Sequence, residues 1–332
     1  MGKFFELKND GLLNKLLFTV AGVFVGFFIY FFSASSTSDS SCVYRFDFIK
    51  KNLNCDVYDV KGVQLNSLQN KLEVLISGFK KTGKANRVSV FVRDLTTTRF
   101  VGIDDSDEYV MASLLKVPLV VGAYKLAEVE PKILDQSISY GGQFSVDTNA
   151  YIKPKETVQK GRSYTIRELV ERAIIYSDNV AAQMLFDYYQ PGFLDRIVQA
   201  LGLDIHTNDL QSENPVTARR YANVFRSLYN SSYLTKEYSN EILSLLARTD
   251  YHNGAVAKLP QHVNVAHKFG ERTFYAAEKE APIRQLHDCG LVYAKDGKEP
   301  YTFCIMTEGV KFEDLEGVLQ EISLIVYNGL VE

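Results

Sequence analysis

Three short segments, in fixed order along a chain of 332 residues, most constrain how this sequence can fold. They are Ser113-Leu114-Leu115-Lys116, Ser177-Asp178-Asn179 and Lys268-Phe269-Gly270. Together they supply two hydroxyl groups and two amines. A fold that uses these groups together must bring distant parts of the chain to one cleft.

The first two segments sit at the starts and ends of predicted helices. Ser113 opens an apolar helical run, which puts Ser113 and Lys116 on one face of its first turn. Ser177 follows a helix with its own start signal, because Thr165 and Glu168 form an S/T-x-x-E capping box ahead of an apolar run.

The third segment lies in a predicted strand over residues 264–270. Period-two alternation sends one set of side chains to one face: Ala266, Lys268 and Gly270. The other face receives Val265, His267 and Phe269. A face of small residues that carries one lysine suits the floor of a cleft.

In this order and context, the three segments resemble the motif set of the penicillin-recognising serine enzymes, most closely class A β-lactamases and their D,D-peptidase relatives. The resemblance runs from about Ser67 to Tyr327. It implies an α/β fold with a five-stranded antiparallel sheet built from both chain ends and flanked by helices. A helical lobe is expected over about residues 113–250, within a catalytic domain over residues 65–332, and the site is expected where the lobes meet.

The resemblance implies covalent catalysis by Ser113. A serine hydroxyl is inert at pH 7 until a neighbour removes its proton, and Lys116 is the nearest candidate. Lys116 can do so only if burial and the charge of Lys268 across the cleft lower its pKa. Ser177 would relay a proton to the leaving nitrogen, and Asn179 would orient Lys116 and hold a substrate amide. Asp178, the middle residue of the second segment, is expected to be structural.

The substrate-binding side of the site departs from the family pattern at one position. The resemblance implies an oxyanion hole made by the backbone N–H groups of Ser113 and Glu271, the residue after Gly270. Phe269 stands where the family has a serine or threonine hydroxyl that helps bind the substrate carboxylate. We expect one of three groups to compensate: Arg272, Arg284 or His287.

A second departure concerns hydrolysis of the acyl-enzyme. The segment between Asn179 and the helix beginning near Thr217 is shorter than the resemblance to class A β-lactamases implies, and the family's loop with a water-activating glutamate normally lies there. Glu213 is the one glutamate available there as a deacylation base, although an acid near a helix entry is also favoured by the helix dipole. Without such a glutamate, the acyl-enzyme should form but hydrolyse slowly.

Three functions therefore remain open from the sequence. The first is a serine hydrolase of class A β-lactamase type that opens β-lactams with slow deacylation. The second is a membrane-anchored D,D-peptidase that acts on the D-Ala-D-Ala stems of the cell wall, and the third is a non-catalytic sensor of muropeptides or β-lactams. The ligand in each case is a small β-lactam or a peptidoglycan stem peptide, and a monomer is expected.

Composition excludes other classes of function. The formal net charge is −3, with acids and bases interspersed, so the chain offers no basic stripe for nucleic acid. No glycine-rich phosphate loop occurs, and the five histidines are scattered without metal-ligand spacing. We therefore expect no cofactor and no metal.

The N-terminus predicts a membrane segment. Leu16 to Ala34 is a run of 19 residues without a charge, and a helix of this length nearly spans a hydrocarbon core of about 30 Å. We expect a cytoplasmic stub and signal-anchor over residues 1–35, a linker over residues 36–64, and a single-pass protein of the cell membrane whose catalytic domain lies outside the cytoplasm. The alternative is secretion after cleavage near Ser33-Ala34-Ser35.

The four cysteines suit an exported protein. Cys42 and Cys55 flank a short segment after the apolar run and are expected to form a local disulfide. Cys289 and Cys304 flank a predicted hairpin around Asp296-Gly297, where the two sulfurs would face each other across adjacent strands. For this second pair, buried free thiols are the alternative, since Pro300 disturbs the strand pairing.

Overall fold

The computed structural model describes residue 48 and residues 65–144, 150–207, 213–275, 281–294 and 299–331. These residues fall within one unit, Tyr44–Glu332. The predicted membrane segment Leu16–Ala34 and the cysteines Cys42 and Cys55 lie outside the described residues. Within the described part of the chain, no helix combines the length and the apolar character needed to cross a membrane.

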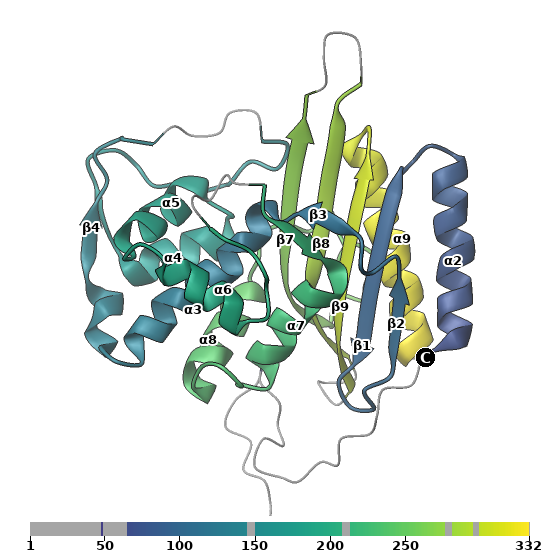
Figure 1. Ribbon diagram of the computed structural model, residues 1–332, viewed down its shortest axis with the longest axis horizontal. Helices are drawn as coiled ribbons and strands as arrows, with labels where there is room; N and C mark the ends of the chain where they lie inside the picture. The colour runs from purple at the N-terminus through teal and green to yellow at the C-terminus, as the bar shows by residue number, and fades with distance from the viewer. Residues whose placement is uncertain are drawn as a thin grey trace, which may run out of the picture. The chain divides into compact units, whose positions relative to one another are not determined.

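A five-stranded antiparallel sheet organises the fold, with strand order β2-β1-β9-β8-β7 (Figure 1). Its strands are β1 (Arg87–Asp94), β2 (Phe100–Ile103), β7 (Asn264–Phe274), β8 (Ile283–Ala294) and β9 (Glu299–Gly309). The first two come from the N-terminal part of the described chain and the other three from its C-terminal part. The sheet expected from both chain ends is therefore confirmed.

Helices cover both faces of this sheet. On one face lie α2 (Asn66–Lys81) and α9 (Phe312–Val331), which pack side by side (Figure 1). The sequence predicts α2 from apolar residues on one helical face, and four of these are buried: Leu68, Leu72, Ile76 and Phe79. They share one hydrophobic core with strand residues such as Val90 and Val292.

The helical lobe lies on the opposite face. It consists of the 3₁₀ turns η1 (Ala112–Leu115) and η2 (Pro131–Asp135) and the helices α3 (Lys116–Ala127), α4 (Ile166–Ile175), α5 (Asn179–Tyr188), α6 (Phe193–Ala200), α7 (Ala218–Tyr229) and α8 (Lys236–Leu246). Two short strand pairs complete it: β3 (Glu108–Val110) with β6 (Pro215–Thr217), and β4 (Ser137–Ser139) with β5 (Ser163–Thr165). The predicted capping box of Thr165 and Glu168 starts α4.

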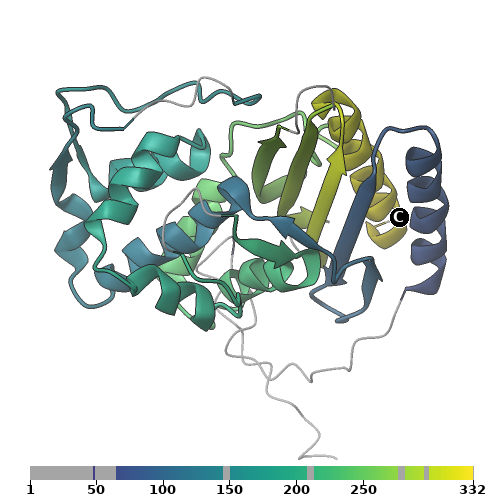
Figure 2. The ribbon, with the colours of Figure 1, turned by 45° about the horizontal axis from the view of Figure 1, so that its top comes forward.

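Alternation along the strands divides the side chains between two cores. Val90 and Val92 pack toward α2 and α9, whereas Phe91 packs toward the helical lobe. On β7, Val265 belongs to the first core and Ala266 to the second, as the period-two pattern predicts. Lys268, two residues beyond Ala266, therefore faces the helical lobe from β7, the edge strand of the sheet. Figure 2 shows the sheet between the helical lobe and the pair α2 and α9.

Candidate active site

Ser113 lies on a tight 3₁₀ turn, η1, rather than in the regular helix that the sequence predicts. The α-helix begins three residues later, at Lys116. Ala112, directly before Ser113, has a positive φ of 48°, which is unusual for a residue other than glycine. Such conformations persist only where the surrounding structure holds them, and they cluster at functional sites. The turn still places Ser113 and Lys116 together as predicted.

The Lys116 amine lies at the centre of a polar cluster. Its Nζ is 3.1 Å from Ser113 Oγ and 3.0 Å from Ser177 Oγ. It also donates to Asn179 Oδ1 at 2.6 Å and to the Ser177 carbonyl oxygen at 2.5 Å. The side chain of Lys116 is buried, so nearly all of its polar contacts are to protein groups. The structure thus brings three other predicted site residues, Ser113, Ser177 and Asn179, to one amine.

Lys268 approaches the same cluster from the sheet. Its Nζ donates to Ser177 Oγ at 2.9 Å and to the Phe269 carbonyl oxygen at 3.0 Å, and the residue is fully buried. The Ser177 hydroxyl therefore lies between two lysines. Ser177 has a positive φ of 56°, so this second hydroxyl also occupies a strained backbone position.

Burial makes both amines less basic. It lowers the pKa of Lys116 from its ordinary value to about 7, against the opposing charges of Asp178 and Glu271. Burial, together with the positive charge of Lys116, lowers the pKa of Lys268 well below its ordinary value. A neutral Lys116 amine can accept the Ser113 proton, which an ammonium group cannot.

Asp178 is structural, as the sequence suggests. It is the N-cap of α5, and its Oδ1 accepts from the Val180 N–H at 2.9 Å. The remaining contacts of its carboxylate hold the preceding loop, through Thr157 Oγ1 at 3.0 Å and the Val158 N–H at 2.9 Å. These bonds fix the start of α5, and this start carries Asn179 to Lys116.

The edge strand β7 packs closely against the nucleophile turn. A Cβ atom on Gly270 would lie 2.9 Å from the Met111 carbonyl oxygen and 3.3 Å from the Leu114 nitrogen, so only glycine fits without a shift. This approach sets Glu271 beside the turn that carries Ser113. A cleft of about 250 Å³ opens here, and its lining includes Ser113, Ser177, Asn179, Phe269, Glu271 and Arg272.

Of the groups expected to replace the missing family hydroxyl, Arg272 lines the cleft. Its Nε is buried and has no hydrogen-bond partner among the described residues. His287 is buried and its Nε2 contacts the Val110 carbonyl oxygen, while Arg284 donates to the Val310 carbonyl oxygen. The expectation that either of these two would reach the substrate carboxylate receives no support from the geometry.

Glu213, the candidate deacylation base, is exposed just before β6. It is not among the described residues that line the cleft. Glu213 therefore stays a prediction. Within the described ranges, no group of three or more His, Cys, Asp or Glu side chains could hold a metal ion.

The predicted Cys289–Cys304 disulfide is present. The two residues lie directly opposite each other on β8 and β9, and Cys289 lies opposite Lys268 on β7. Residues that pair in this way point to the same face of a sheet. The disulfide therefore sits in the same cross-strand row as the buried Lys268 amine.

Comparison with known proteins identifies the family. The sequence profile described as the β-lactamase enzyme family matches residues 67–330. The chain belongs to this family. The ROB-1 β-lactamases of Haemophilus influenzae and Mannheimia haemolytica are each 28% identical to it over 162 residues, which cover 46% of this chain and 48% of each relative. The match thus spans about half the length of these curated relatives.

Solved structures show the same fold as this β-lactamase-family chain. A β-lactamase from Chitinophaga pinensis is 20% identical with a TM-score of 0.67, covering 78% of this chain and 99% of that one. A class A β-lactamase from Bacteroides cellulosilyticus is 20% identical with a TM-score of 0.65, covering 79% and 98%. PBP-A is 18% identical with a TM-score of 0.66, covering 81% and 98%. The class A β-lactamase fold predicted from the motifs is confirmed.

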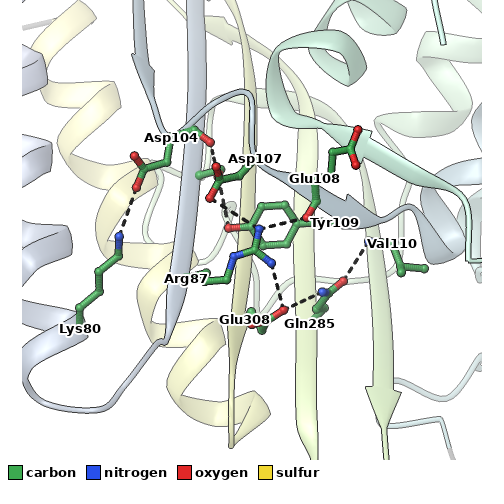
Figure 3. Close-up of polar contacts among 10 residues, drawn as sticks. Lys80, Arg87, Asp104, Asp107, Glu108, Tyr109, Val110, Gln285 and Glu308 are labelled. Carbon is green, nitrogen blue, oxygen red and sulfur yellow. Dashed lines mark hydrogen bonds and ion pairs between the residues drawn. The ribbon is translucent and has the colours of Figure 1, made fainter. Parts of the chain in front are cut away.

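The sequence motifs of this β-lactamase-family chain do not reveal a polar network that lies behind η1, the turn that carries Ser113 (Figure 3). The Val110 N–H donates to Gln285 Oε1 at 3.0 Å, and Gln285 Nε2 donates to Glu308 Oε2 at 2.9 Å. Arg87 Nη1 lies 3.3 Å from the same Glu308 oxygen. Figure 3 shows these side chains in line across the strands, leading to the backbone that precedes Ser113.

His287 holds the other backbone group of Val110. Its Nδ1 accepts from the Thr307 N–H at 3.3 Å, so its Nε2 carries the proton and donates to the Val110 carbonyl oxygen at 3.2 Å. Burial lowers the pKa of His287 to about 3, which keeps the ring neutral. Gln285 and His287 on β8 thus clamp both polar groups of Val110, a role the sequence offered no motif to reveal.

We expect Gln285→Leu to slow acylation of Ser113 by a β-lactam about tenfold. The substitution leaves the Val110 N–H without its partner, and small displacements of a reacting group cost large factors in rate. Stopped-flow measurement should place the loss in the acylation rate constant, with little change in initial binding. Gln320→Leu, on the exposed face of α9, is the control. A lower melting temperature with unchanged acylation would show that Gln285 only stabilises the fold.

Proposed function

We propose that this chain is an active-site serine hydrolase that opens β-lactams through a covalent acyl-enzyme at Ser113 and deacylates slowly. The observation that carries the proposal is the continuous chain of contacts from Ser113 Oγ through Lys116 Nζ and Ser177 Oγ to Lys268 Nζ, at 3.1, 3.0 and 2.9 Å. The chain opens onto a cleft lined by the nucleophile itself.

In the proposed reaction, neutral Lys116 takes the hydroxyl proton of Ser113 as its Oγ attacks the lactam carbonyl carbon. A C–O bond forms, the C–N bond breaks, and the proton reaches the departing nitrogen through the Ser177 hydroxyl. The backbone N–H groups of Ser113 and Glu271 would stabilise the oxyanion. Arg272 lines the cleft, and its Nε has no hydrogen-bond partner in the part of the chain that the structure describes, so it would bind the substrate carboxylate. Water then hydrolyses the ester and restores Ser113.

The slow second step is proposed because the acids in the cleft are already engaged. Among the described residues that line it, the acids are Asp178 and Glu271. Asp178 accepts from Thr157, Val158 and Val180, and Glu271 accepts from two backbone N–H groups. Both carboxylates are thus already used by protein donors.

We expect mass spectrometry a few minutes after mixing with benzylpenicillin to find most of the protein carrying an intact penicilloyl group. Turnover should then be slow and preceded by a burst. Glu213→Gln is the control: if Glu213 activates the water, the wild type shows little adduct and the variant accumulates it. Rapid steady-state hydrolysis without adduct would contradict slow deacylation.

The same features support a D,D-peptidase as the second candidate. An acylating serine in a cleft whose described acids are both hydrogen-bonded, and a cation for a terminal carboxylate, also suit the D-Ala-D-Ala end of a cell-wall stem. One solved relative of similar fold, a PBP-A variant, was captured as an acyl-enzyme complex with penicillin G. Release of D-alanine from a synthetic stem peptide would favour this candidate. Failure to form any adduct would instead favour a non-catalytic sensor.

The proposed location is the cell membrane, with the catalytic domain outside the cytoplasm. Two observations support it: the uncharged run Leu16–Ala34 ahead of the domain, and the Cys289–Cys304 disulfide within it. Disulfides of this kind persist in oxidising compartments and are rare in the cytoplasm. Secretion after cleavage of the apolar run is the alternative.

A further inference from the structure

The segment 150–154 forms one wall of the cleft, to which Ala150, Ile152 and Pro154 contribute. It belongs to the connection between β4 and β5 in the helical lobe, yet it reaches the opposite face of the sheet. There the Tyr151 ring stacks on Phe312, the first residue of α9, with ring centroids 4.5 Å apart. The wall therefore crosses the edge strand β7.

The Glu271 carboxylate ties this wall to β7. The Tyr151 N–H donates to Glu271 Oε2 at 3.0 Å, and the Ile152 N–H donates to Oε1 at 2.8 Å. Each carboxylate oxygen thus accepts one hydrogen bond, and the two donors are consecutive backbone N–H groups. Hydrogen bonds to an ionised acceptor are stronger than hydrogen bonds between neutral groups. The side chain that makes these bonds belongs to the residue whose backbone N–H is proposed for the oxyanion hole.

The far side of the wall is held through a second acid. Glu316 on α9 accepts from the Tyr151 hydroxyl at 3.3 Å and from the Tyr251 hydroxyl at 3.2 Å. The Tyr251 ring in turn packs on Phe269, with centroids 4.5 Å apart. Phe269 replaces the residue whose hydroxyl helps bind the substrate carboxylate in the family. Here its ring packs on Tyr251 and so helps to support the wall.

The wall keeps the cleft small. Its volume of about 250 Å³ is below the range of about 300–1,000 Å³ that is typical of ligand pockets. A β-lactam nucleus with a short side chain suits such a space, whereas a bulky acyl side chain requires the wall to move outward.

We propose that the Glu271 carboxylate is a latch that holds the wall 150–154 in place, and that it selects substrates with small acyl side chains. This inference rests on the proposed function. It assigns the side chain of Glu271 a specificity role that is separate from the backbone N–H of the same residue.

The test compares two probes: 6-aminopenicillanic acid, which lacks an acyl side chain, and a cephalosporin with a branched oxyimino side chain. We divide the acylation rate constant of the cephalosporin by that of 6-aminopenicillanic acid. In Glu271→Ala this ratio should rise about tenfold. Glu271→Gln keeps the size of the side chain but turns an NH₂ group toward one donor, so it should shift the ratio in the same direction. Glu321→Ala, which removes a surface acid paired with Lys258, is the control and should leave the ratio unchanged.

Hydrogen exchange measures the latch without any reaction. The amides of Tyr151 and Ile152 should exchange at least tenfold faster in both Glu271 variants, and at the wild-type rate in Glu321→Ala. If the amide exchange rates are unchanged in the Glu271 variants, Glu271 does not hold the wall. If the amides exchange faster but the ratio of acylation rate constants is unchanged, the wall does not determine specificity. Absence of acylation by either probe in the wild type would refute the proposed function, and the exchange data would still decide whether Glu271 holds the wall.

Discussion

Ser113→Ala is expected to abolish covalent labelling by a labelled penicillin and to reduce any turnover by about 10³-fold or more. Losses of this size follow the removal of an activated nucleophile, because the remaining groups provide only binding and electrostatic stabilisation. Ser113 is the hydroxyl that lines the cleft and also opens a turn with a lysine three residues later. Labelling is read by mass spectrometry of the intact protein and of its peptides.

The control for this experiment is Ser77→Ala on the exposed face of α2, which should label like the wild type. Circular dichroism of Ser113→Ala should match the wild type, since the hydroxyl is not part of a core. Intact labelling in Ser113→Ala would disprove the assignment of the nucleophile. Labelling of Ser177 in its place would show that the roles of the two hydroxyls are exchanged.

Lys116→Met is expected to slow acylation by about 10² to 10⁴, the range lost with a general base. The pH dependence tests the mechanism more directly. Because the pKa of Lys116 is lowered to about 7 and the neutral amine is the active form, acylation should accelerate as the pH rises through about 7. This rise of the acylation rate with pH should be absent in Lys116→Met. Rate constants across pH 5.5 to 9 measure both effects.

Lys125→Met provides a matched control, because Lys125 lies on the same helix but pairs with Glu128 and the Tyr233 carbonyl oxygen. Its rate and pH profile should equal those of the wild type. A wild-type acylation rate that does not change between pH 6 and 8 would contradict the role of Lys116. If the acylation rate of Lys116→Met still rises with pH, another group is responsible for the rise, and Lys268 is the first to examine.

The parts of the site that follow from local sequence could be predicted, and so could the layout of the fold. The capping box at Thr165, the alternation around Lys268 and the apolar face of α2 each reflect contacts between near neighbours in the chain. Asp178 was correctly predicted to be structural, because an acid at the start of a helix has an obvious local use.

The missed features depend on contacts between segments far apart in the sequence. Gln285 and His287 lie on β8 and reach Val110 on β3, which is 175 and 177 residues earlier in the chain, and no local pattern states this approach. The Glu271 side chain is similar, since its partners belong to a segment about 120 residues earlier whose path no periodicity describes. The positive φ of Ala112 likewise arises from packing around the turn.

The sheet that unites both ends of the catalytic unit also fixes when activity can arise during synthesis. β1 pairs along its length with β9, from Arg87 opposite Glu308 to Asp94 opposite Tyr301. A chain that emerges N-terminus first must keep β1 without this partner until β9 has been made, and contacts of such long separation form slowly. Lys268 lies on β7 of the same sheet, so the two lysine amines cannot meet before β7 has been made. Until then Ser113 and Lys116, which share one turn, lack the second amine of the site.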